Sequence, residues 1–352
     1  MRVLHLLNHT NRMNGHVHAA VDLACEQIML GHDVAVASGG GDFDALLAAH
    51  KVETMFVNHE RRPAALIRGL ISLHRLAHDW RADLVHAHMV TSAVLAWPIC
   101  KALGIPLIAT VHNEFQKSSI MMGLGTRVIA VSEAVGRSMQ KRGIPKSRLN
   151  VVLNGTIGSA RFEGKDRTPR HLDSPAIIFV GGLHPRKGLP DLFIAFNAVH
   201  KRNPQARLYI VGDGPFREAY IDLVSSMECR SAVSFMGAQD DPFPLLKGAD
   251  IFVLPSHADP APLVLSEARE AGCAVVATNV DGIPELLENG NAGILVPARD
   301  PTRLSEILCS LVENSETLRE WKTKSRFNLE HLRIERVARE TLDVYASARS
   351  RL

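Results

Sequence analysis

The feature that most constrains this chain is an alternation of short β-branched runs with longer amphipathic stretches, repeated in both halves of the sequence. Alternation of this kind is typical of βαβ units, whose strands pair in parallel. The sequence therefore predicts an α/β protein with two Rossmann-like domains. The expected strands are Val3–Leu7, Val34–Ser38, Leu84–Ala87, Leu107–Val111, Val128–Val131, Ala176–Val180, Arg207–Val211, Val233–Phe235, Ile251–Leu254 and Val275–Ala277.

The polar stretch 158–174 lacks apolar periodicity and predicts the boundary between these domains. We expect an N-terminal domain at 1–165 and a C-terminal domain at 172–327, followed by one charged helix from about 328. Ligands of doubly wound sheets lie beyond the carboxyl ends of the strands, so the cleft between the domains is the expected site. The expected helices lie near 16–30, 63–80, 91–103, 132–142, 189–202, 215–228, 262–272, 300–313 and 328–350.

Composition excludes several classes of protein. Hydrophobic residues make up 46% and charged residues 22%, which indicates a globular chain. No apolar run reaches the roughly 18 residues of a membrane span, and the first residues lack the apolar core of an export signal. The five cysteines show no CxxC spacing, as expected for buried thiols in a reducing compartment. We expect a cytoplasmic protein without a nucleic-acid partner.

Charge is distributed unevenly between the two halves. Residues 1–170 carry 20 Lys and Arg against 13 Asp and Glu, whereas the remaining residues carry 20 against 24. The basic, amphipathic segment 61–81 and a second cluster near 141–148 suit an anionic membrane surface or a charged lipid-linked acceptor. A solvated surface without such a role is the alternative. We therefore keep a peripheral position at the inner face of the cell membrane as a second expectation for localisation.

The segment 256–272 predicts an anion site at the start of a helix. Pro262 suits the first helical position, which would leave the backbone amides of Leu263, Val264 and Leu265 unpaired. Such amides, together with the helix dipole, attract phosphate. Glu267 lies one turn inside this helix, within reach of a ribose, although an ordinary capped helix with a surface Glu is the simpler interpretation.

These residues are similar to the signature of the family 4 retaining glycosyltransferases, which carry a Glu-x7-Glu motif. Here the motif reads Asp259-x7-Glu267, with Asp in the first position. Val180–Gly188 resembles the phosphate-contacting loop of the family, and the likeness covers nearly the whole chain, more loosely before residue 150. The other matching positions are Ala268, Gly272, Val275–Thr278, Gly282, Pro284, Glu285, Gly293, Val211–Pro215, Asn154, Gly155, Val131–Glu133, Thr110–Asn113, Asn14 and Gly15.

The resemblance implies the GT-B fold, in which two Rossmann-like domains face each other across a cleft and the helix at about 328–352 crosses back to the first domain. It implies a nucleotide-sugar donor on the C-terminal domain and a glycan or lipid-linked acceptor on the N-terminal domain. No metal and no cofactor are expected, because the nucleotide sugar is itself a substrate.

The resemblance also implies roles for individual residues. The expected catalytic residues are His112, Asp259 and Lys187, with His112 and Asp259 orienting the donor sugar. Glu267 is expected on the ribose. The expected donor-binding positions are Arg186, Lys187, Glu267, Leu263, Val264, Gly182, Gly15 and Gly237.

Three positions depart from the family pattern. Asn14 replaces a Gly in the N-terminal turn, where Asn tolerates a left-handed backbone better than most residues. Gly182 stands where the family usually has Arg, and we expect Arg186, beside Lys187, to supply that guanidinium charge. Asp259 is one methylene shorter than Glu, which shortens its reach to the sugar. The departures at Gly182 and Asp259 leave room for a non-catalytic partner that binds sugar nucleotides.

Three further features carry weaker signals. Asp42-Phe43-Asp44 matches the metal-binding DxD pattern of the other glycosyltransferase fold, but the rest of the chain does not support that fold. We expect His86 to be a core or structural residue. For His88 a core role and a functional role both stay open.

The function predicted is a retaining glycosyltransferase that moves a sugar, with a UDP-sugar favoured, to a glycan or lipid-linked acceptor in bacterial polysaccharide or lipopolysaccharide synthesis. A nucleotide-sugar epimerase, which needs no acceptor, or a glycan phosphorylase, which needs inorganic phosphate, is the alternative within the same fold.

Overall fold

The computed structural model describes residues 1–12, 14–57 and 63–350, and for residues 63–68 it describes the backbone alone. The chain divides into two compact units. The N-terminal unit comprises Met1–Glu163 and Glu330–Leu352, and the C-terminal unit comprises Gly164–Leu329. The division at 163/164 falls inside the polar stretch that the sequence singled out.

A seven-stranded parallel sheet forms the centre of the N-terminal unit, with the order β3-β2-β1-β4-β5-β6-β7. Its central strands are buried because most of their residues are apolar or β-branched and helices cover the sheet; His5 on β1 and His86 on β4 are buried polar exceptions. The strands are β1 (Arg2–Leu6), β2 (Asp33–Ser38), β3 (Glu53–Phe56), β4 (Leu84–Ala87), β5 (Leu107–Val111), β6 (Arg127–Ala130) and β7 (Leu149–Val151).

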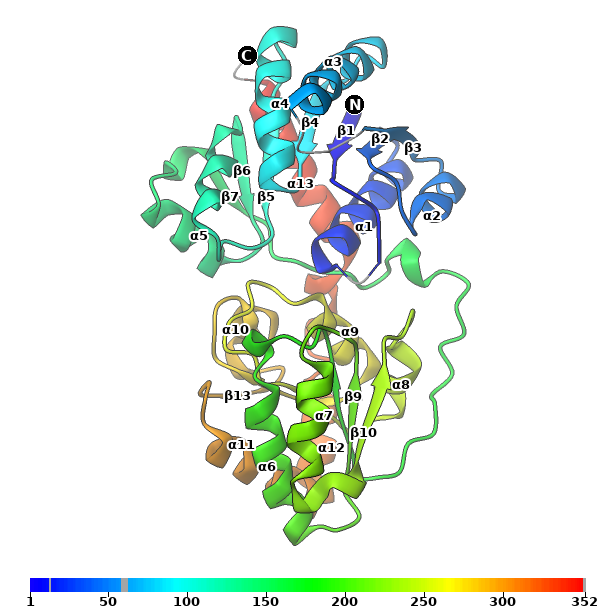
Figure 1. Cartoon of the computed structure of the whole chain (residues 1–352), viewed down its shortest axis with the longest axis vertical. Coiled ribbons are helices and arrows are strands. Elements are labelled where there is room, and N and C mark those ends of the chain that lie inside the picture. The colour runs from blue at the N-terminus through cyan, green and yellow to red at the C-terminus, as the bar shows by residue number, and fades with distance from the viewer. Residues whose placement is uncertain (13, 58–62, 351–352) are drawn as a thin grey trace. The chain divides into compact units, whose positions relative to one another are not determined.

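Helices connect these strands, and the last helix of the chain packs among them (Figure 1). They are α1 (Gly15–Met29), α2 (Asp44–Ala49), α3 (Pro63–Asp79), α4 (Val90–Leu103), α5 (Glu133–Lys141) and α13 (Ile334–Arg349), with short 3₁₀ helices at Lys117–Leu124, Lys146–Arg148, Ala160–Phe162 and Leu329–Leu332. Helix α13 lies against α1 and β6. Its buried side chains Val344 and Tyr345 share a core cluster with Val3, Leu84 and Ile108.

A six-stranded parallel sheet forms the centre of the C-terminal unit, with the order β10-β9-β8-β11-β12-β13. Its strands are β8 (Ala176–Val180), β9 (Arg207–Val211), β10 (Val233–Gly237), β11 (Ile251–Leu254), β12 (Ala274–Thr278) and β13 (Ile294–Val296). The helices are α6 (Leu189–Arg202), α7 (Arg217–Ser225), α8 (Phe243–Gly248), α9 (Leu263–Ala271), α10 (Ile283–Leu286), α11 (Pro301–Glu313) and α12 (Ser315–Lys324), with 3₁₀ helices at Pro185–Lys187, Glu228–Ala232 and Glu288–Gly290.

The predicted α/β class is confirmed. The helices α2, α8, α10 and α12 were not predicted, and the strands that were not predicted lie at the edges of the sheets. Strands β3, β7 and β13 were not predicted. The burial of β3 is low along its whole length, so its sequence carries no apolar pattern, and β7 and β13 have only three residues each. Each of the three is the last strand at one side of its sheet.

The expectation of one continuous helix over 328–350 is wrong. Arg333 has an extended backbone (φ −72°, ψ 142°) that separates the 3₁₀ helix Leu329–Leu332 from α13. The reason is pairing: Ile157 and Arg333 form a parallel β-bridge, in which the Ile334 amide donates to the Ile157 carbonyl at 2.9 Å. A helical Arg333 would lose this bridge.

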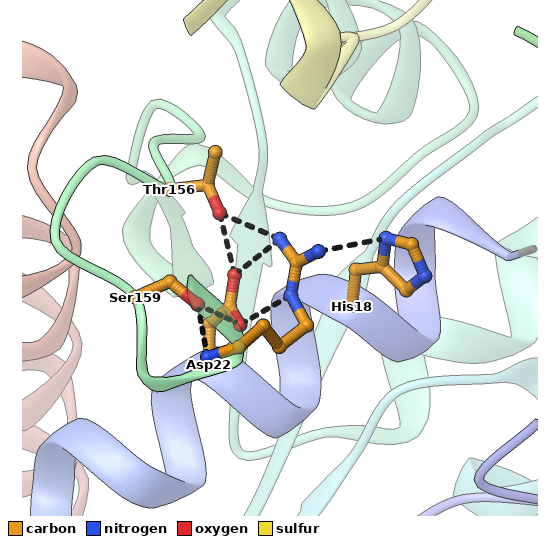
Figure 2. Close-up of polar contacts among 5 residues, drawn as sticks. His18, Asp22, Thr156 and Ser159 are labelled. Atoms are coloured by element: carbon orange, nitrogen blue, oxygen red, sulfur yellow. Dashed lines mark hydrogen bonds and ion pairs between the residues drawn. The ribbon is translucent and has the colours of Figure 1, made fainter. Parts of the chain in front are cut away.

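A buried ion pair between Arg161 and Asp22 holds the end of the segment Met1–Glu163 against α1 (Figure 2). The guanidinium of Arg161 donates to both carboxylate oxygens of Asp22, at 2.6 and 2.9 Å. The hydroxyls of Thr156 and Ser159 donate to the same carboxylate, and a further guanidinium nitrogen lies 3.2 Å from Nδ1 of His18. These contacts satisfy both charges, which burial alone would destabilise.

Among the described residues, every helix falls short of a membrane span, either in length or in apolar content.

Candidate active-site residues

In the C-terminal unit the loop after β8 runs into the 3₁₀ helix Pro185–Lys187, and its geometry requires glycine at the end. Gly188 has a φ of +68°, and a Cβ there would lie 2.0 Å from the carbonyl oxygen of Pro255. The loop therefore packs closely against the segment that follows β11, which begins at Pro255. The amide of His257 donates to the carbonyl of Arg186 at 2.7 Å, which fixes this contact.

This contact brings two cations and one carboxylate together. The ammonium Nζ of Lys187 lies 2.6 Å from Oδ2 of Asp259, and both side chains are more than nine-tenths buried. A guanidinium nitrogen of Arg186 lies 3.7 Å from Oδ1 of the same carboxylate and donates to the carbonyl of Ala258 at 3.2 Å. The hydroxyl of Ser256 also donates to Asp259, at 3.2 Å. We call Arg186, Lys187 and Asp259 the ion-pair cluster.

A second carboxyl group, that of Asp281, accepts a hydrogen bond from the backbone of the cluster. The amide of Asp259 donates to Oδ2 of Asp281 at 2.7 Å. Burial raises the pKa of Asp281, and the charge of Asp259 adds to the shift, while that hydrogen bond opposes it. Asp281 thus holds the backbone of Asp259 in place.

The cluster precedes α9, which begins at Leu263 with Pro262 as its N-cap residue. The first amides of an α-helix have no intrahelical acceptor, so those of Leu263 and Val264 are available to an anion. The expectation for Leu265 is wrong, because its amide donates to the carbonyl of Pro262 at 3.2 Å. Glu267 is buried on the same helix, so its interpretation as an ordinary surface Glu is also wrong.

Sequence reasoning missed the residue that anchors α9. Arg269 is fully buried, and its guanidinium donates to the carbonyls of Ser325, Leu286 and Phe327. Burial lowers its pKa to about 10. A charged residue in an amphipathic helix is usually solvated, so only the fold could reveal this role.

In the N-terminal unit, His112 directly follows β5 and is half-buried. Its Nε2 lies 3.1 Å from Nδ1 of His88, which follows β4, and Nε2 of His88 lies 2.9 Å from Nδ1 of His5 on β1. Since β1, β4 and β5 are neighbours in the sheet, the three rings form a row. His86 on β4 is fully buried, as expected for a core residue. No motif or spacing in the sequence pointed to His5.

The remaining predicted positions lie as follows. Gly15 is the first residue of α1, and open space surrounds its Cβ position. Gly182 lies in the loop after β8, where a Cβ would come within 3.2 Å of the His184 ring. Gly237 ends β10 with a φ of +68° and accepts from the amide of Gly212 at 2.8 Å.

The DxD residues cap a loop. Asp44 accepts from the hydroxyl of Thr10 at 2.5 Å and from the amide of Gly41 at 3.1 Å. Asp42 accepts from the amide of Arg12 at 2.9 Å. These hydrogen bonds explain both carboxylates as turn-forming groups.

The basic segment 61–81 is described in part. Arg61 and Arg62 lie outside the described residues, and so does the side chain of Arg68. In the described part of α3, Arg75 and Ile71 are exposed beside a surface pocket that Met55 and Trp80 also line.

Comparison with known proteins decides the family. Residues 174–314 match the family model described as "Glycosyl transferases group 1", and residues 13–156 match the one described as "Glycosyltransferase Family 4". A glycogen synthase of Mycobacterium tuberculosis is 30% identical over 309 residues, which cover 81% of this chain and 74% of that protein. The chain belongs to the family 4 glycosyltransferases.

Solved structures show that this glycosyltransferase has the GT-B fold. Anabaena HepE, crystallised in complex with UDP, superimposes with a TM-score of 0.83 at 19% identity and covers 99% of this chain and 100% of its own. WaaG, described as a glycosyltransferase involved in lipopolysaccharide biosynthesis, superimposes with a TM-score of 0.74 at 16% identity, covering 97% and 99% of the two chains. The GT-B fold predicted from the sequence is therefore confirmed.

Proposed function

We propose that this glycosyltransferase is a retaining enzyme that transfers a hexose from a UDP-sugar to a glycan or lipid-linked acceptor in bacterial polysaccharide or lipopolysaccharide synthesis. The observation that carries the proposal is the ion-pair cluster at the start of α9. In it two cations pair with Asp259, which lies four residues before the first helical residue of α9, and the first amides of a helix attract phosphate.

In this proposal the C-terminal unit holds the diphosphate of the donor. Arg186 and Lys187 contact the phosphate oxygens together with the amides of Leu263 and Val264, and Glu267 accepts from the ribose hydroxyls. Negative charge grows on the diphosphate as the bond to the sugar breaks, so these groups bind the transition state more strongly than the donor. Three glycines, which have no side chain, let the backbone approach the donor. They are Gly182 in the loop after β8, Gly15 at the start of α1 and Gly237 at the end of β10.

The transfer itself breaks the bond between the anomeric carbon and the diphosphate oxygen. The acceptor hydroxyl forms the new bond on the same face, its proton goes to a phosphate oxygen, and nucleoside diphosphate leaves. Asp259 and His112 orient the sugar during this step. We propose that neither a metal ion nor a cofactor takes part, since Arg186 and Lys187 supply the positive charge.

Similar proteins support the choice of donor and pathway. HepE has been crystallised with UDP and also with UDP-glucose. The Mycobacterium tuberculosis relative is a glycogen synthase, and WaaG acts in lipopolysaccharide biosynthesis. These relatives favour a UDP-sugar as donor and a glycan as acceptor.

A thermal-shift panel of UDP-, GDP- and ADP-sugars, with and without EDTA, tests the donor. Ligand at about 100 times its Kd stabilises the native protein by about 2.7 kcal/mol. We expect UDP-sugars to raise the melting temperature and EDTA to have no effect. A shift with GDP- or ADP-sugars alone would contradict the UDP assignment, and a shift that EDTA abolishes would contradict the metal-free mechanism.

Release of UDP that depends on an added acceptor tests the reaction. We expect turnover only when donor and acceptor are both present. A new sugar nucleotide formed without an acceptor would identify an epimerase instead, and a requirement for inorganic phosphate would identify a phosphorylase. Donor binding without any turnover would favour the non-catalytic interpretation.

We also propose a cytoplasmic protein that docks on the anionic inner face of the cell membrane through α3. Phe56 is 72% exposed and Ile71 is 50% exposed, and Arg75 lies on the same helix as Ile71. Apolar and basic side chains together are typical of interfacial helices. Lipid-linked acceptors would lie on the same surface.

A further inference from the structure

Four polar side chains of the N-terminal unit, three of them buried and the fourth half-buried, form one continuous chain of hydrogen bonds. It begins at Gln27 on α1, whose Oε1 lies 2.8 Å from Nε2 of His5. It continues from Nδ1 of His5 to Nε2 of His88 at 2.9 Å, and from Nδ1 of His88 to Nε2 of His112 at 3.1 Å. We call Gln27, His5, His88 and His112 the histidine chain.

The orientation of Gln27 sets the direction of every bond in the histidine chain. Its amide nitrogen Nε2 donates to the hydroxyl of Tyr345 at 3.2 Å, so its oxygen Oε1 accepts from His5. A neutral imidazole has one N–H and one acceptor nitrogen. His5 therefore carries its proton on Nε2 and accepts at Nδ1 from His88, and His88 in turn accepts at Nδ1 from Nε2–H of His112.

The chain works in this way only if the rings are uncharged, because an imidazolium donates from both nitrogens. Burial lowers the pKa of His5 to about 4 and that of His88 well below its usual value. Burial also lowers the pKa of His112 to about 3, and the neighbouring His16 adds to that shift. All three rings of the histidine chain are thus neutral at pH 7.

We propose that His5 and His88 are positioning residues that hold His112 in the tautomer with its proton on Nε2, so that Nδ1 of His112 accepts a hydrogen bond from a hydroxyl of the donor sugar. Among the residues that the structure describes, Nδ1 of His112 has no hydrogen-bond partner. The identity of the hydroxyl donor rests on the proposed function, whereas the tautomer rests on the histidine chain alone.

A buried metal ion is the competing interpretation of the same residues. One ring nitrogen each from His5, His86 and His88 lies within 4.8 Å of the others. All six ring nitrogens of these residues are already engaged: those of His86 contact the hydroxyls of Tyr345 at 2.5 Å and Thr110 at 2.6 Å, and the others belong to the histidine chain. A metal ion would have to displace these bonds.

His86 provides a matched control for His88. The two rings pack against each other with centroids 4.2 Å apart and planes tilted by 33°, and both are buried. The hydrogen bonds of His86 go to Thr110 and to the hydroxyl of Tyr345, which reaches the histidine chain only at Gln27, the end farthest from His112. Replacing either ring perturbs the same part of the core, but only replacement of His88 interrupts the histidine chain.

The decisive measurement is the tautomer of His112 in the ligand-free protein. Protein labelled with ¹⁵N-histidine gives a long-range ¹H–¹⁵N spectrum whose pattern distinguishes a ring protonated on Nε2 from one protonated on Nδ1 or on both. The signal of His112 is assigned by its loss in His112→Asn. We expect protonation on Nε2 at pH 7; protonation on Nδ1, or on both nitrogens, would overturn the proposal.

Variants test whether the chain causes this tautomer. In His88→Phe we expect the Nε2–H tautomer of His112 to lose its preference and kcat to fall at least tenfold, with a smaller change in KM. In His86→Phe we expect the tautomer and kcat to stay near those of the wild type. An unchanged tautomer in a folded His88→Phe protein would contradict the proposal.

A remote pair of variants covers the case in which a Phe variant fails to fold. Gln27→Leu removes the acceptor for His5, three hydrogen bonds away from His112, and we expect a mixture of His112 tautomers. Gln27→Glu keeps an acceptor there, and we expect the wild-type tautomer. Equal spectra for the two variants would contradict a directional chain.

Two outcomes distinguish this inference from a metal site and from a failure of the proposed function. Metal analysis of the purified protein that finds one equivalent of zinc, with shifted ring signals of His5, His86 and His88, would overturn it in favour of a metal site. If His112 carries its proton on Nε2 but no sugar nucleotide binds, the proposed function fails while the tautomer assignment stands.

Discussion

The two sheets of this glycosyltransferase carry polar groups at the same structural position, the carboxyl ends of central parallel strands. In one unit these groups are neutral, and in the other they are charged. In the N-terminal unit the groups after β4 and β5 are uncharged imidazoles that hydrogen-bond to one another. In the C-terminal unit the groups after β8 and β11 are Arg186, Lys187 and Asp259, which pair as ions.

In the proposed function, this difference suits the two units to two kinds of ligand. Neutral groups distinguish the hydroxyls of a sugar by the direction of hydrogen bonds, and they avoid the desolvation cost of a buried charge. Fixed cations suit a diphosphate, whose charge grows during the reaction. Asp259 keeps Lys187 compensated while the donor is absent.

The largest expected effect concerns an ion pair that lies outside both sites. Asp22→Ala leaves Arg161 buried without its carboxylate, and we expect the free energy of unfolding to fall by about 3–5 kcal/mol in urea denaturation. Because the pair only fastens Arg161 to α1, transfer by the folded fraction should persist. The double variant Asp22→Leu/Arg161→Met should recover most of the stability; no recovery would show that the loss has another cause.

The next effect concerns the charged site. Lys187→Ala and Glu267→Ala should each lower the transfer rate at least 100-fold, or about 3 kcal/mol, since each removes a proposed contact with the donor. Lys201→Ala is the matched control, because Lys201 is exposed and pairs with Glu228 at the surface. Rates near the wild type in both site variants would disprove the assignment of the donor site.

The pH dependence of stability tests the neutral site. The pKa of His5 is about 4 in the folded protein against 6.5 in the unfolded chain, so protons bind the unfolded chain first as the pH falls. The free energy of unfolding should therefore decrease between pH 6.5 and pH 4, and His5 should account for about 2 kcal/mol of the decrease between pH 7 and pH 4.5.

Urea denaturation at the two pH values measures this contribution. In His5→Gln the decrease should be smaller by about 2 kcal/mol, whereas His171→Gln should behave as the wild type because the side chain of His171 is 92% exposed. Equal pH dependence in His5→Gln and the wild type would contradict the prediction, because it would mean that folding does not lower the pKa of His5.

The smallest effect concerns the surface of the N-terminal unit. Arg75→Gln should weaken binding to vesicles that contain anionic lipids about fivefold, equivalent to about 1 kcal/mol. Co-sedimentation with the vesicles measures it. Arg303→Gln, an exposed residue of the C-terminal unit, should have no effect. Binding that does not depend on anionic lipid would contradict docking through α3.

The buried strands were predictable from the sequence, and the edge strands were not. β4, β5, β8 and β11 have the predicted bounds because every residue in them is buried, which selects apolar and β-branched residues almost throughout, with His86 of β4 as the exception. β3 is largely exposed, so hydrogen bonding to β2 alone makes it a strand. The split before α13 arises in the same way, from the pairing of Arg333 with Ile157.

The candidate site was predictable only where motif residues lie close in the chain or match a family pattern. Asp259 and Glu267 share one helix and its approach, so their neighbourhood follows from spacing. The buried roles of Arg269 and His5 depend on which carbonyls or side chains the fold brings to them. Neither residue type carries a local signal for such a role.

By itself the sequence determined the α/β class, the buried strands and the residues that mark the family, because these depend on periodicity and on short motifs. The tertiary structure alone decided that Lys187 meets Asp259 across 72 residues and that His5 meets His88 across 83. Hydrogen bonds and ion pairs act over a few ångströms in space and are indifferent to separation along the chain. Only the packing of the strands could therefore bring these partners together.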